Sequence, residues 1–268
     1  MNRGRIENDK YYTPIEVAGK CWEELIKAIN MDNITEIIEP SCGDGAFFHF
    51  GKYRPTIGYD IEPNIEGEKI IKADFLKLDI AYKKGRLIIG NPPYGRTMEK
   101  AKQFYRMSVR VADYIGFILP ISQLNNTRSL YEFDLIKSID LGEEIYTDRK
   151  LHCCFNIYAR PSTGRVNCKE KDKLEDITIY RKGSKGYEER AYDVRMCYWG
   201  DATAGKILHE GEHYAAEYKI KIHNKKLKDK ITSVLQNYEW GNMKCIAARK
   251  IQQFHIIQIL RKEIPEIR

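Results

Sequence analysis

The segment Asn91-Pro92-Pro93-Tyr94 contains groups that could hold an amino group. Two consecutive prolines fix the backbone and remove two N–H donors, which leaves the carbonyl of Pro92 free to accept a hydrogen bond. The side chain of Asn91 adds a second acceptor, and two acceptors can hold both hydrogens of an amino group. The ring of Tyr94 could stack on the planar ring that carries this group. These residues therefore favour chemistry at an exocyclic nitrogen.

Three other segments could bind a nucleoside-like cofactor. Glu39–Phe47 is a glycine-containing loop, and glycines allow a backbone to approach a ligand closely. Asp60 could accept hydrogen bonds from the two hydroxyls of a ribose, and Asp74 could accept one from an amino group beside the aromatic Phe75. Taken singly, the loop could be an ordinary tight turn, Asp60 could cap a turn and Asp74 could be solvated. Together, at three successive predicted strand ends, they indicate a binding site.

Short apolar segments before these residues predict buried strands. Such continuous apolar runs, bounded by turn residues, are typical of parallel sheets that helices cover on both faces. The segments are Thr35–Ile38, Thr56–Tyr59, Lys69–Ile71, Leu87–Ile89 and Tyr114–Leu119. Ile139–Tyr146 and Cys153–Ala159 are close enough in sequence to form a hairpin. We therefore predict an α/β, doubly wound, Rossmann-like fold, with a mostly parallel sheet and an antiparallel edge hairpin.

Three helices are predicted around these strands. After Thr13-Pro14, apolar residues recur at intervals of three and four as far as Ile29, with Thr13 as the capping residue and Pro14 at the first helical position. The other two predicted helices are Met98–Val111 and about Asn126–Ser138.

The composition of the chain changes after Arg160. Pro161–Gly164 is a predicted linker, so we expect two domains, 1–160 and 161–268. Residues 1–159 contain 22 Lys and Arg against 23 Asp and Glu, whereas residues 160–268 contain 23 against 15. Two helices are predicted over 227–238 and 246–260, and Pro265 ends the second. The basic second domain favours a polyanionic partner, although a solvated surface would give the same composition.

Composition excludes several classes of protein. Hydrophobic residues make up 43% of the 268 residues and charged residues 31%, which excludes a mainly disordered chain. No apolar run approaches the ~18 residues that cross a bilayer, and no signal peptide is recognisable. The seven cysteines include no C-x-x-C pair, which argues against a disulfide framework and a zinc ribbon. We expect a soluble, cytoplasmic protein with no membrane partner and no metal site.

Residues 11 to about 160 resemble the γ-arranged, N-P-P-Y type of S-adenosylmethionine-dependent adenine-N6 DNA methyltransferases. The resemblance implies a class I methyltransferase-like fold, with 1–160 as the cofactor-binding catalytic domain and 161–268 as a basic target-recognition region. It implies that Tyr12-Thr13-Pro14 contacts the methionine part of S-adenosylmethionine and that Glu39 meets its amino group. The implied cofactor-binding residues are Tyr12, Thr13, Pro14, Glu39, Ser41, Cys42, Gly43, Gly45, Asp60, Ile61, Asp74, Phe75 and Asn91. The implied catalytic residues are Asn91, Pro92, Pro93, Tyr94 and Tyr146.

The mechanism implied by the resemblance is methylation of a flipped-out adenine in double-stranded DNA, clamped between Tyr94 and Tyr146. Tyr146 belongs to the loosely matching segment Ile145–Lys150, where a plain strand aromatic is the alternative. The short basic region suggests a small or degenerate target. The same motif also occurs in enzymes that methylate adenine in RNA or a glutamine side chain in a protein, and the extra residues after the cofactor loop favour nucleic acid as the substrate. A catalytically silent, nucleic-acid-binding subunit is a further alternative. A cognate restriction nuclease or partner subunit would fit this family.

Four other signals carry weaker expectations. His209-Glu210-Gly211-Glu212-His213 matches the zinc-protease pattern H-E-x-x-H, but the glycine interrupts a helix, so we predict a polar loop. Cys153-Cys154 should point to opposite faces of a strand and cannot share a metal. Six lysines could neutralise phosphates or form a solvated face, and the catalytic motif favours phosphates: Lys219, Lys221, Lys225, Lys226, Lys228 and Lys230. Four residues that could read bases are assigned to the core of the second domain: Tyr192, Arg195, Tyr198 and Trp199.

Overall fold

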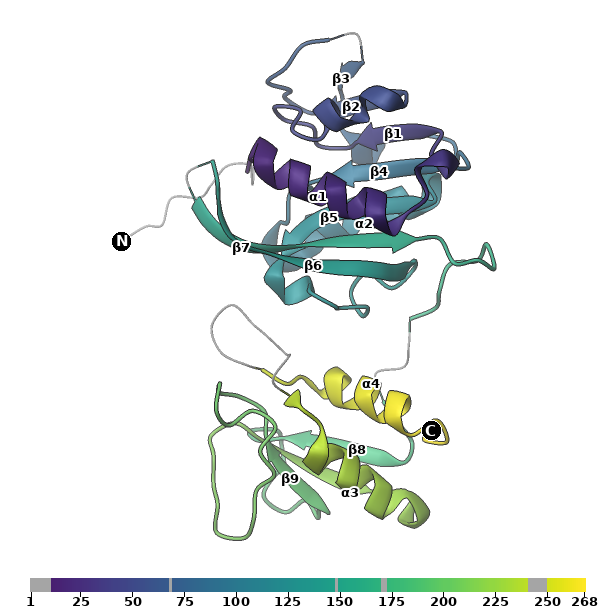
Figure 1. The fold of residues 1–268 in the computed structure, drawn as a ribbon. Coiled ribbons are helices and arrows are strands. Elements are labelled where there is room, and N and C mark those ends of the chain that lie inside the picture. The colour runs from purple at the N-terminus through teal and green to yellow at the C-terminus, as the bar shows by residue number, and fades with distance from the viewer. Residues whose placement is uncertain (1–10, 68, 148, 170–172, 241–249) are drawn as a thin grey trace. The chain divides into compact units, whose positions relative to one another are not determined.

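The computed structural model describes residues 11–67, 69–147, 149–169, 173–240 and 250–268, which form two compact units, Met1–Lys169 and Glu170–Arg268 (Figure 1). The division falls after Lys169 rather than after Arg160. Arg160 belongs to the first unit because its guanidinium group donates to the carbonyls of Val109 and Ala112, at 2.6 and 2.8 Å. Asn167 also remains attached there, since its N–H donates to the carbonyl of Glu132 at 2.8 Å.

The first unit contains a seven-stranded sheet in the order β3-β2-β1-β4-β5-β7-β6. The first five strands are parallel, and β7 is antiparallel to both β5 and β6. The strands are β1 (Glu36–Glu39), β2 (Thr56–Asp60), β3 (Ile70–Lys72), β4 (Arg86–Gly90), β5 (Tyr114–Pro120), β6 (Asp134–Tyr146) and β7 (Arg149–Ala159). This architecture confirms the predicted fold class. The order reverses between β1 and β4, which is the position where open α/β sheets bind ligands.

Helices cover both faces of this sheet (Figure 1). Helix α1 (Ile15–Ala28) places Val17, Cys21 and Leu25 in one apolar core, and α2 (Glu99–Val111) places Ala101 and Phe104 in the other. The central strands supply residues to both cores, because successive side chains of a strand point to opposite faces. In β4, for example, Leu87 and Ile89 pack on the α1 side, and Ile88 packs on the α2 side.

Two predictions about the helices are wrong. No helix forms over Asn126–Ser138; Ile121–Gln123 is a single 3₁₀ turn, and β6 already begins at Asp134. The alternating burial of β6 and its long antiparallel pairing with β7 show that this apolar spacing belongs to an edge strand. Thr13 does not cap α1 either: Pro14 is the N-cap residue, and no side chain caps this end.

The second unit is a three-stranded antiparallel sheet with two helices. The strands β8 (Ile177–Arg181), β9 (Val194–Cys197) and β10 (Glu217–Ile222) have the order β8-β10-β9. Their apolar residues share a core with α3 (Lys228–Asn237) and α4 (Gln253–Glu263), which confirms the two helices predicted in this region. The predicted start of the second helix is wrong within the described residues, because 250–252 are not helical and α4 begins at Gln253; Ile246 itself lies outside the described residues. The ends of this unit meet, because the N–H of Asp176 donates to the carbonyl of Arg268 at 3.0 Å.

None of the described helices combines the length and the hydrophobicity that crossing a bilayer requires.

Candidate active site

A cavity of about 240 Å³ opens at the carboxyl ends of β1, β2 and β4. It brings together most of the predicted site residues: Tyr12, Thr13, Glu39, Ser41, Cys42, Gly43, Asp60, Ile61, Asp74, Phe75, Asn91, Pro92, Pro93 and Tyr94. Three predicted residues do not line it, namely Pro14, Gly45 and Tyr146. The successive strand ends thus converge on one site, as the sheet order requires.

The glycine loop after β1 has a backbone that other residues rarely adopt. Gly43 has a φ of 50° and Gly45 a φ of 77°, both in the left-handed region. A Cβ atom on Gly43 would lie 3.1 Å from the ring of Tyr12, and one on Gly45 would collide with Ile65. Gly45 therefore shapes the loop without lining the cavity. The N–H of Gly43 donates to Oδ2 of Asp60 at 2.9 Å, which ties the loop to the end of β2.

Glu39, the last residue of β1, lines the cavity and has a buried side-chain oxygen without a partner. The residue is 3% exposed, its Oε1 accepts from the N–H of Phe47 at 3.4 Å, and its Oε2 has no hydrogen-bond partner. Burial raises the pKa of this carboxyl group well above its usual value. A buried acceptor without a partner is unfavourable, so a ligand that brings a cationic donor would stabilise it.

Asp60 and Asp74 line the cavity and also organise their own turns. The Oδ1 of Asp60 accepts from the N–H of Glu62 at 2.8 Å, and the Oδ1 of Asp74 accepts from the N–H of Leu76 at 3.1 Å. Both carboxylates keep further lone pairs for a ligand. Ile61 is half exposed beside Asp60, whereas Phe75 is 1% exposed and stacks on Phe104 at 5.8 Å. Phe75 is thus a packed wall rather than an open aromatic platform.

The Asn91-Pro92-Pro93-Tyr94 turn follows β4 directly and exposes two free acceptors. The Nδ2 of Asn91 donates to the carbonyl of Tyr11 at 3.3 Å and to Oγ1 of Thr13 at 3.2 Å. The backbone carbonyl of Asn91 accepts from the hydroxyl of Ser41 at 3.3 Å, which joins this turn to the glycine loop. No described residue donates to Oδ1 of Asn91 or to the carbonyl of Pro92. The two acceptors predicted to hold an amino group therefore remain available at the cavity.

Tyr94 lines the cavity with its ring and buries its hydroxyl, which lies 3.5 Å from Sγ of Cys153. Burial raises the pKa of this hydroxyl well above its usual value. Tyr146 is fully buried in the core on the α1 side, and its hydroxyl has no hydrogen-bond partner. The clamp predicted between the two tyrosines is therefore not present in this structure. Tyr146 supports the region behind Tyr94 and does not face the cavity.

The sequence interpretation missed several lining residues. Lys100, Gln103 and Phe104 come from the first turns of α2, and their spacing of three and four residues would have placed them on one face of the predicted helix. Carboxylic acids line the same cavity in greater number: Glu39, Asp44, Asp60, Glu62 and Asp74. Lys100 is the one basic residue among the lining residues, so the cavity favours a cationic ligand.

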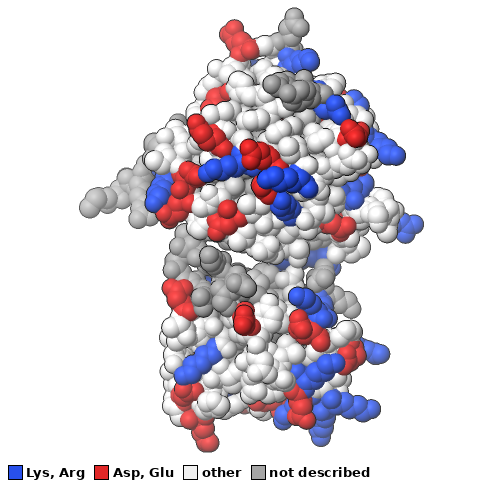
Figure 2. All heavy atoms as spheres, in the orientation of Figure 1, with Lys and Arg blue, Asp and Glu red and all other residues white. Residues whose placement is uncertain are grey.

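Most of the lysines predicted to contact phosphates have partners within the second unit. The Nζ of Lys219 is buried and donates to the carbonyls of Tyr187 and Glu188, both at 2.9 Å. Three others form ion pairs: Lys221 and Lys228 with Asp193, and Lys230 with Glu266. Lys225 and Lys226, on the 3₁₀ turn before α3, have no acidic partner among the described residues. On the face drawn in Figure 2, acidic and basic side chains are interspersed.

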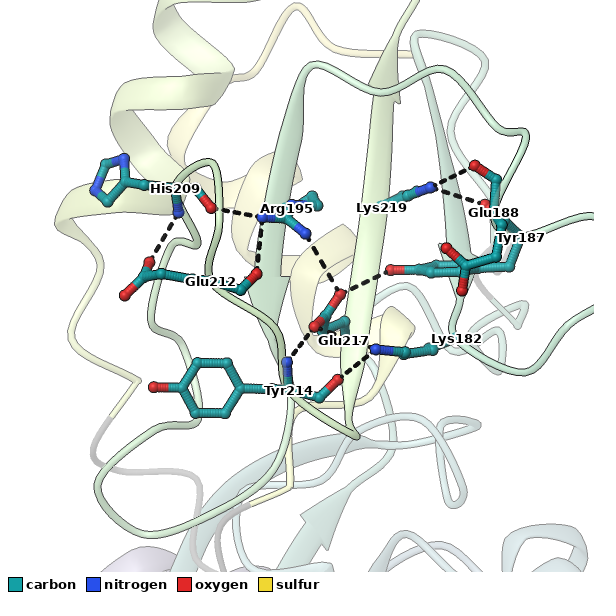
Figure 3. A network of polar contacts seen from close by, with 9 residues as sticks. All are labelled: Lys182, Tyr187, Glu188, Arg195, His209, Glu212, Tyr214, Glu217 and Lys219. Atoms are coloured by element: carbon teal, nitrogen blue, oxygen red, sulfur yellow. Dashed lines mark hydrogen bonds and ion pairs between the residues drawn. The ribbon is translucent and has the colours of Figure 1, made fainter.

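Buried charges organise the loops of the second unit (Figure 3). Glu217 is 1% exposed and accepts from the hydroxyl of Tyr187 at 3.3 Å, and it pairs with Lys182 and Arg195 at 3.4 and 3.8 Å. Arg195 also donates to the carbonyls of His209 and Glu212. The His209–His213 segment is therefore a tethered loop, as predicted, and not a helix.

The aromatic residues of this unit divide between core and surface. Tyr198 is buried, as predicted, and Arg195 is buried within the polar network. Tyr192 and Trp199 are 45% and 54% exposed, so their assignment to the core is wrong. In the first unit, Cys153 and Cys154 lie in different cores on opposite faces of β7, which confirms the prediction that they diverge.

Comparison with known proteins gives matches of structure. A scan against protein-family profiles finds no match, and a search of the curated proteins finds none. A Pyrococcus horikoshii protein assigned as an RNA methyltransferase matches with a TM-score of 0.47 and 12% identity, over 59% of this chain and 90% of that chain. A Listeria monocytogenes protein assigned as a class I S-adenosylmethionine-dependent methyltransferase matches with a TM-score of 0.48 and 14% identity, over 63% and 66%.

The magnesium protoporphyrin IX methyltransferase of Synechocystis, crystallised with S-adenosylmethionine, matches with a TM-score of 0.43 and 11% identity, over 55% of this chain and 79% of that chain. These three structures are of proteins named as methyltransferases. Similarity at this level says nothing about the substrate.

Proposed function

We propose that this chain transfers a methyl group from S-adenosylmethionine to the N6 amino group of adenine in double-stranded DNA. One observation carries the proposal: a single cavity is lined by three residues with an acceptor that lacks a partner among the described residues, namely Oε2 of Glu39, Oδ1 of Asn91 and the carbonyl of Pro92. The first fits a cationic donor group, and the other two lie on the turn beside Tyr94, where an aromatic amine would be held.

The residues of the cavity fit the parts of the cofactor. Oε2 of Glu39 would accept from the ammonium group, and the carboxylate of Asp60 would accept from the ribose hydroxyls. Half-exposed Ile61 would cover one side of the adenine, and Asp74 would accept from its amino group. When bound, S-adenosylmethionine supplies an electrophilic methyl group on a positively charged sulfur, which suits a cavity lined mainly by carboxylic acids.

The chain's own contribution to the reaction is orientation. Oδ1 of Asn91 and the carbonyl of Pro92 would accept both hydrogens of the substrate amine, which leaves the nitrogen lone pair directed away from the turn. Tyr94 would stack on the base, and its anchored hydroxyl keeps the ring fixed. The new C–N bond replaces the methyl–sulfur bond, the sulfur retains the electron pair, and the nitrogen releases one proton to water. No strong general base is required.

We propose DNA over the other substrates of this chemistry because of the position and composition of the second unit. That unit follows the catalytic unit in the chain and is rich in Lys and Arg, as expected for a region that recognises nucleic acid. Adenine in structured RNA is the second candidate, since Lys225 and Lys226 would suit the phosphates of either polymer. A protein glutamine and a silent binding subunit remain as outcomes of the test.

The test compares methyl transfer from labelled S-adenosylmethionine to duplex DNA, structured RNA and protein. We expect label in DNA at the adenine N6, and a loss on the order of 10²–10³ in Asn91→Ala with cofactor binding retained. Asn30→Ala is the matched control. Asn30 is exposed and caps the 3₁₀ turn Met31–Asn33 before the amino end of β1, whereas the cavity lies at the carboxyl ends of the strands. Label in RNA or protein alone would overturn the substrate assignment. Calorimetry that finds no cofactor binding would indicate a silent subunit.

A further inference from the structure

The hydroxyl of Thr13 serves the catalytic turn instead of helix α1. Thr13 is 7% exposed, and its Oγ1 accepts from Nδ2 of Asn91 at 3.2 Å. The second hydrogen of the same amide is directed at the carbonyl of Tyr11, 3.3 Å away. Both donors of the Asn91 side chain are therefore occupied by residues just before α1.

This arrangement fixes which way the Asn91 amide points. A backbone carbonyl can only accept a hydrogen bond, so the atom of Asn91 that faces Tyr11 must be the nitrogen. If the amide were turned over, its oxygen would face that carbonyl and two acceptors would oppose each other. Oδ1 is thus presented to the cavity, where the proposed reaction needs an acceptor.

The segment that holds Asn91 is itself attached at separate points of the fold. The N–H of Tyr12 donates to Oγ1 of Thr147, at the tip of the β6–β7 hairpin, at 3.0 Å. The hydroxyl of Tyr12 accepts from Nδ2 of Asn64, in the loop between β2 and β3, at 2.6 Å. These attachments place Thr13 independently of any ligand.

We infer that Thr13 is a positioning residue, which sets the orientation of Asn91 and so the capacity of the turn to hold an amine. The inference rests on the proposed function for its catalytic consequence and on the two hydrogen bonds of Nδ2 for its structural part. It is separate from a role in binding the methionine part of the cofactor, because Thr13 accepts from Asn91 with its hydroxyl oxygen and keeps its own O–H for another acceptor. Removal of the hydroxyl leaves Nδ2 with one acceptor, and the amide can then rotate into unproductive orientations.

The test uses Thr13→Val, which removes the hydroxyl at nearly constant shape, and Thr13→Ser, which keeps it. Thr56→Val is the control, since Thr56 is similarly buried at the amino end of β2, away from the cavity. With saturating cofactor and DNA, we expect the single-turnover rate of Thr13→Val to fall about two- to tenfold, as loss of one hydrogen bond implies. Thr13→Ser and Thr56→Val should stay close to wild type. In Thr13→Val, the Kd for S-adenosylmethionine should change by a smaller factor than the rate does.

A second measurement does not depend on turnover. The side-chain amide protons of Asn91, assigned in ¹⁵N-edited NMR spectra by their loss in Asn91→Asp, should exchange with water faster in Thr13→Val than in wild type. Unchanged exchange would overturn the inference, as would a weaker cofactor Kd combined with a normal rate at saturation. If wild-type protein methylates no substrate, the proposed function fails, and the exchange measurement still decides whether Thr13 orients Asn91.

Discussion

Replacing Glu39 by Gln tests the assignment of the cofactor's ammonium group. Glu39 is 3% exposed, and its Oε2 has no partner. The substitution keeps the size of the side chain and one acceptor oxygen but removes the charge. A hydrogen bond to a charged group contributes about 1.5–3 kcal/mol, so we expect the Kd for S-adenosylmethionine to rise about 10- to 150-fold.

The same substitution should stabilise the ligand-free protein near neutral pH. Burial gives Glu39 a higher pKa in the folded state than in the unfolded state, so the folded state binds the proton more tightly. This contribution to stability is complete below the unfolded pKa of about 4.3 and is lost as the pH rises through the folded pKa. Glutamine does not titrate. The free energy of unfolding of Glu39→Gln, relative to wild type, should therefore increase from about pH 4 to about pH 8.

Calorimetric titration with S-adenosylmethionine and urea denaturation at both pH values measure the two effects. Glu66→Gln, at an exposed position, is the control and should change neither quantity. If Glu39→Gln binds the cofactor as tightly as wild type, the ammonium group is held elsewhere. If its relative stability is the same at both pH values, burial does not perturb this carboxyl group.

Three further perturbations have defined outcomes. A bound ammonium group should lower the raised pKa of Glu39, so the affinity for the cofactor should rise with pH and binding should release protons. Calorimetry in buffers of different ionisation enthalpy detects this release, and equal binding heats in all buffers would contradict it. Glu217→Leu leaves Arg195 and Lys182 without their carboxylate and should destabilise the second unit by about 3–5 kcal/mol in urea denaturation, while cofactor binding by the first unit persists. Lys225→Ala with Lys226→Ala should reduce the slope of log K against log salt for DNA binding by about 2, and an unchanged slope would remove these lysines from the interface.

Strand ends and the turns that follow them could be predicted from the sequence because their signals are local. Each buried strand is a short apolar run, and the residues that follow these runs must meet at one edge of a parallel sheet. Asp60, Asp74 and Asn91 therefore converge as expected. The type and order of these residues carried enough information to locate the cavity.

The predictions that failed depend on contacts between distant segments. The apolar spacing of Asn126–Ser138 fits a helix, and only pairing with β7 makes its second part a strand. A loose motif predicts Tyr146 at the cavity, but its side chain packs in the core on the α1 side. Thr13 has the residue type of a helix cap, and no local rule indicates a partner at Asn91, 78 positions along the chain. Trp199 has a large aromatic side chain of the kind that usually packs in a core, but it lies at the surface.

The hydrogen bond between Asp176 and Arg268 has a consequence for how such a protein can change over time. The second unit encloses its own apolar core, and its first and last described segments are neighbours. A unit of this kind can be joined to another protein at a single place on that protein's surface. It can be inserted into a surface loop, or exchanged for another module of similar size, without distorting the fold that receives it. A compact unit of this kind can therefore be gained, lost or exchanged as one piece while the first unit keeps its fold.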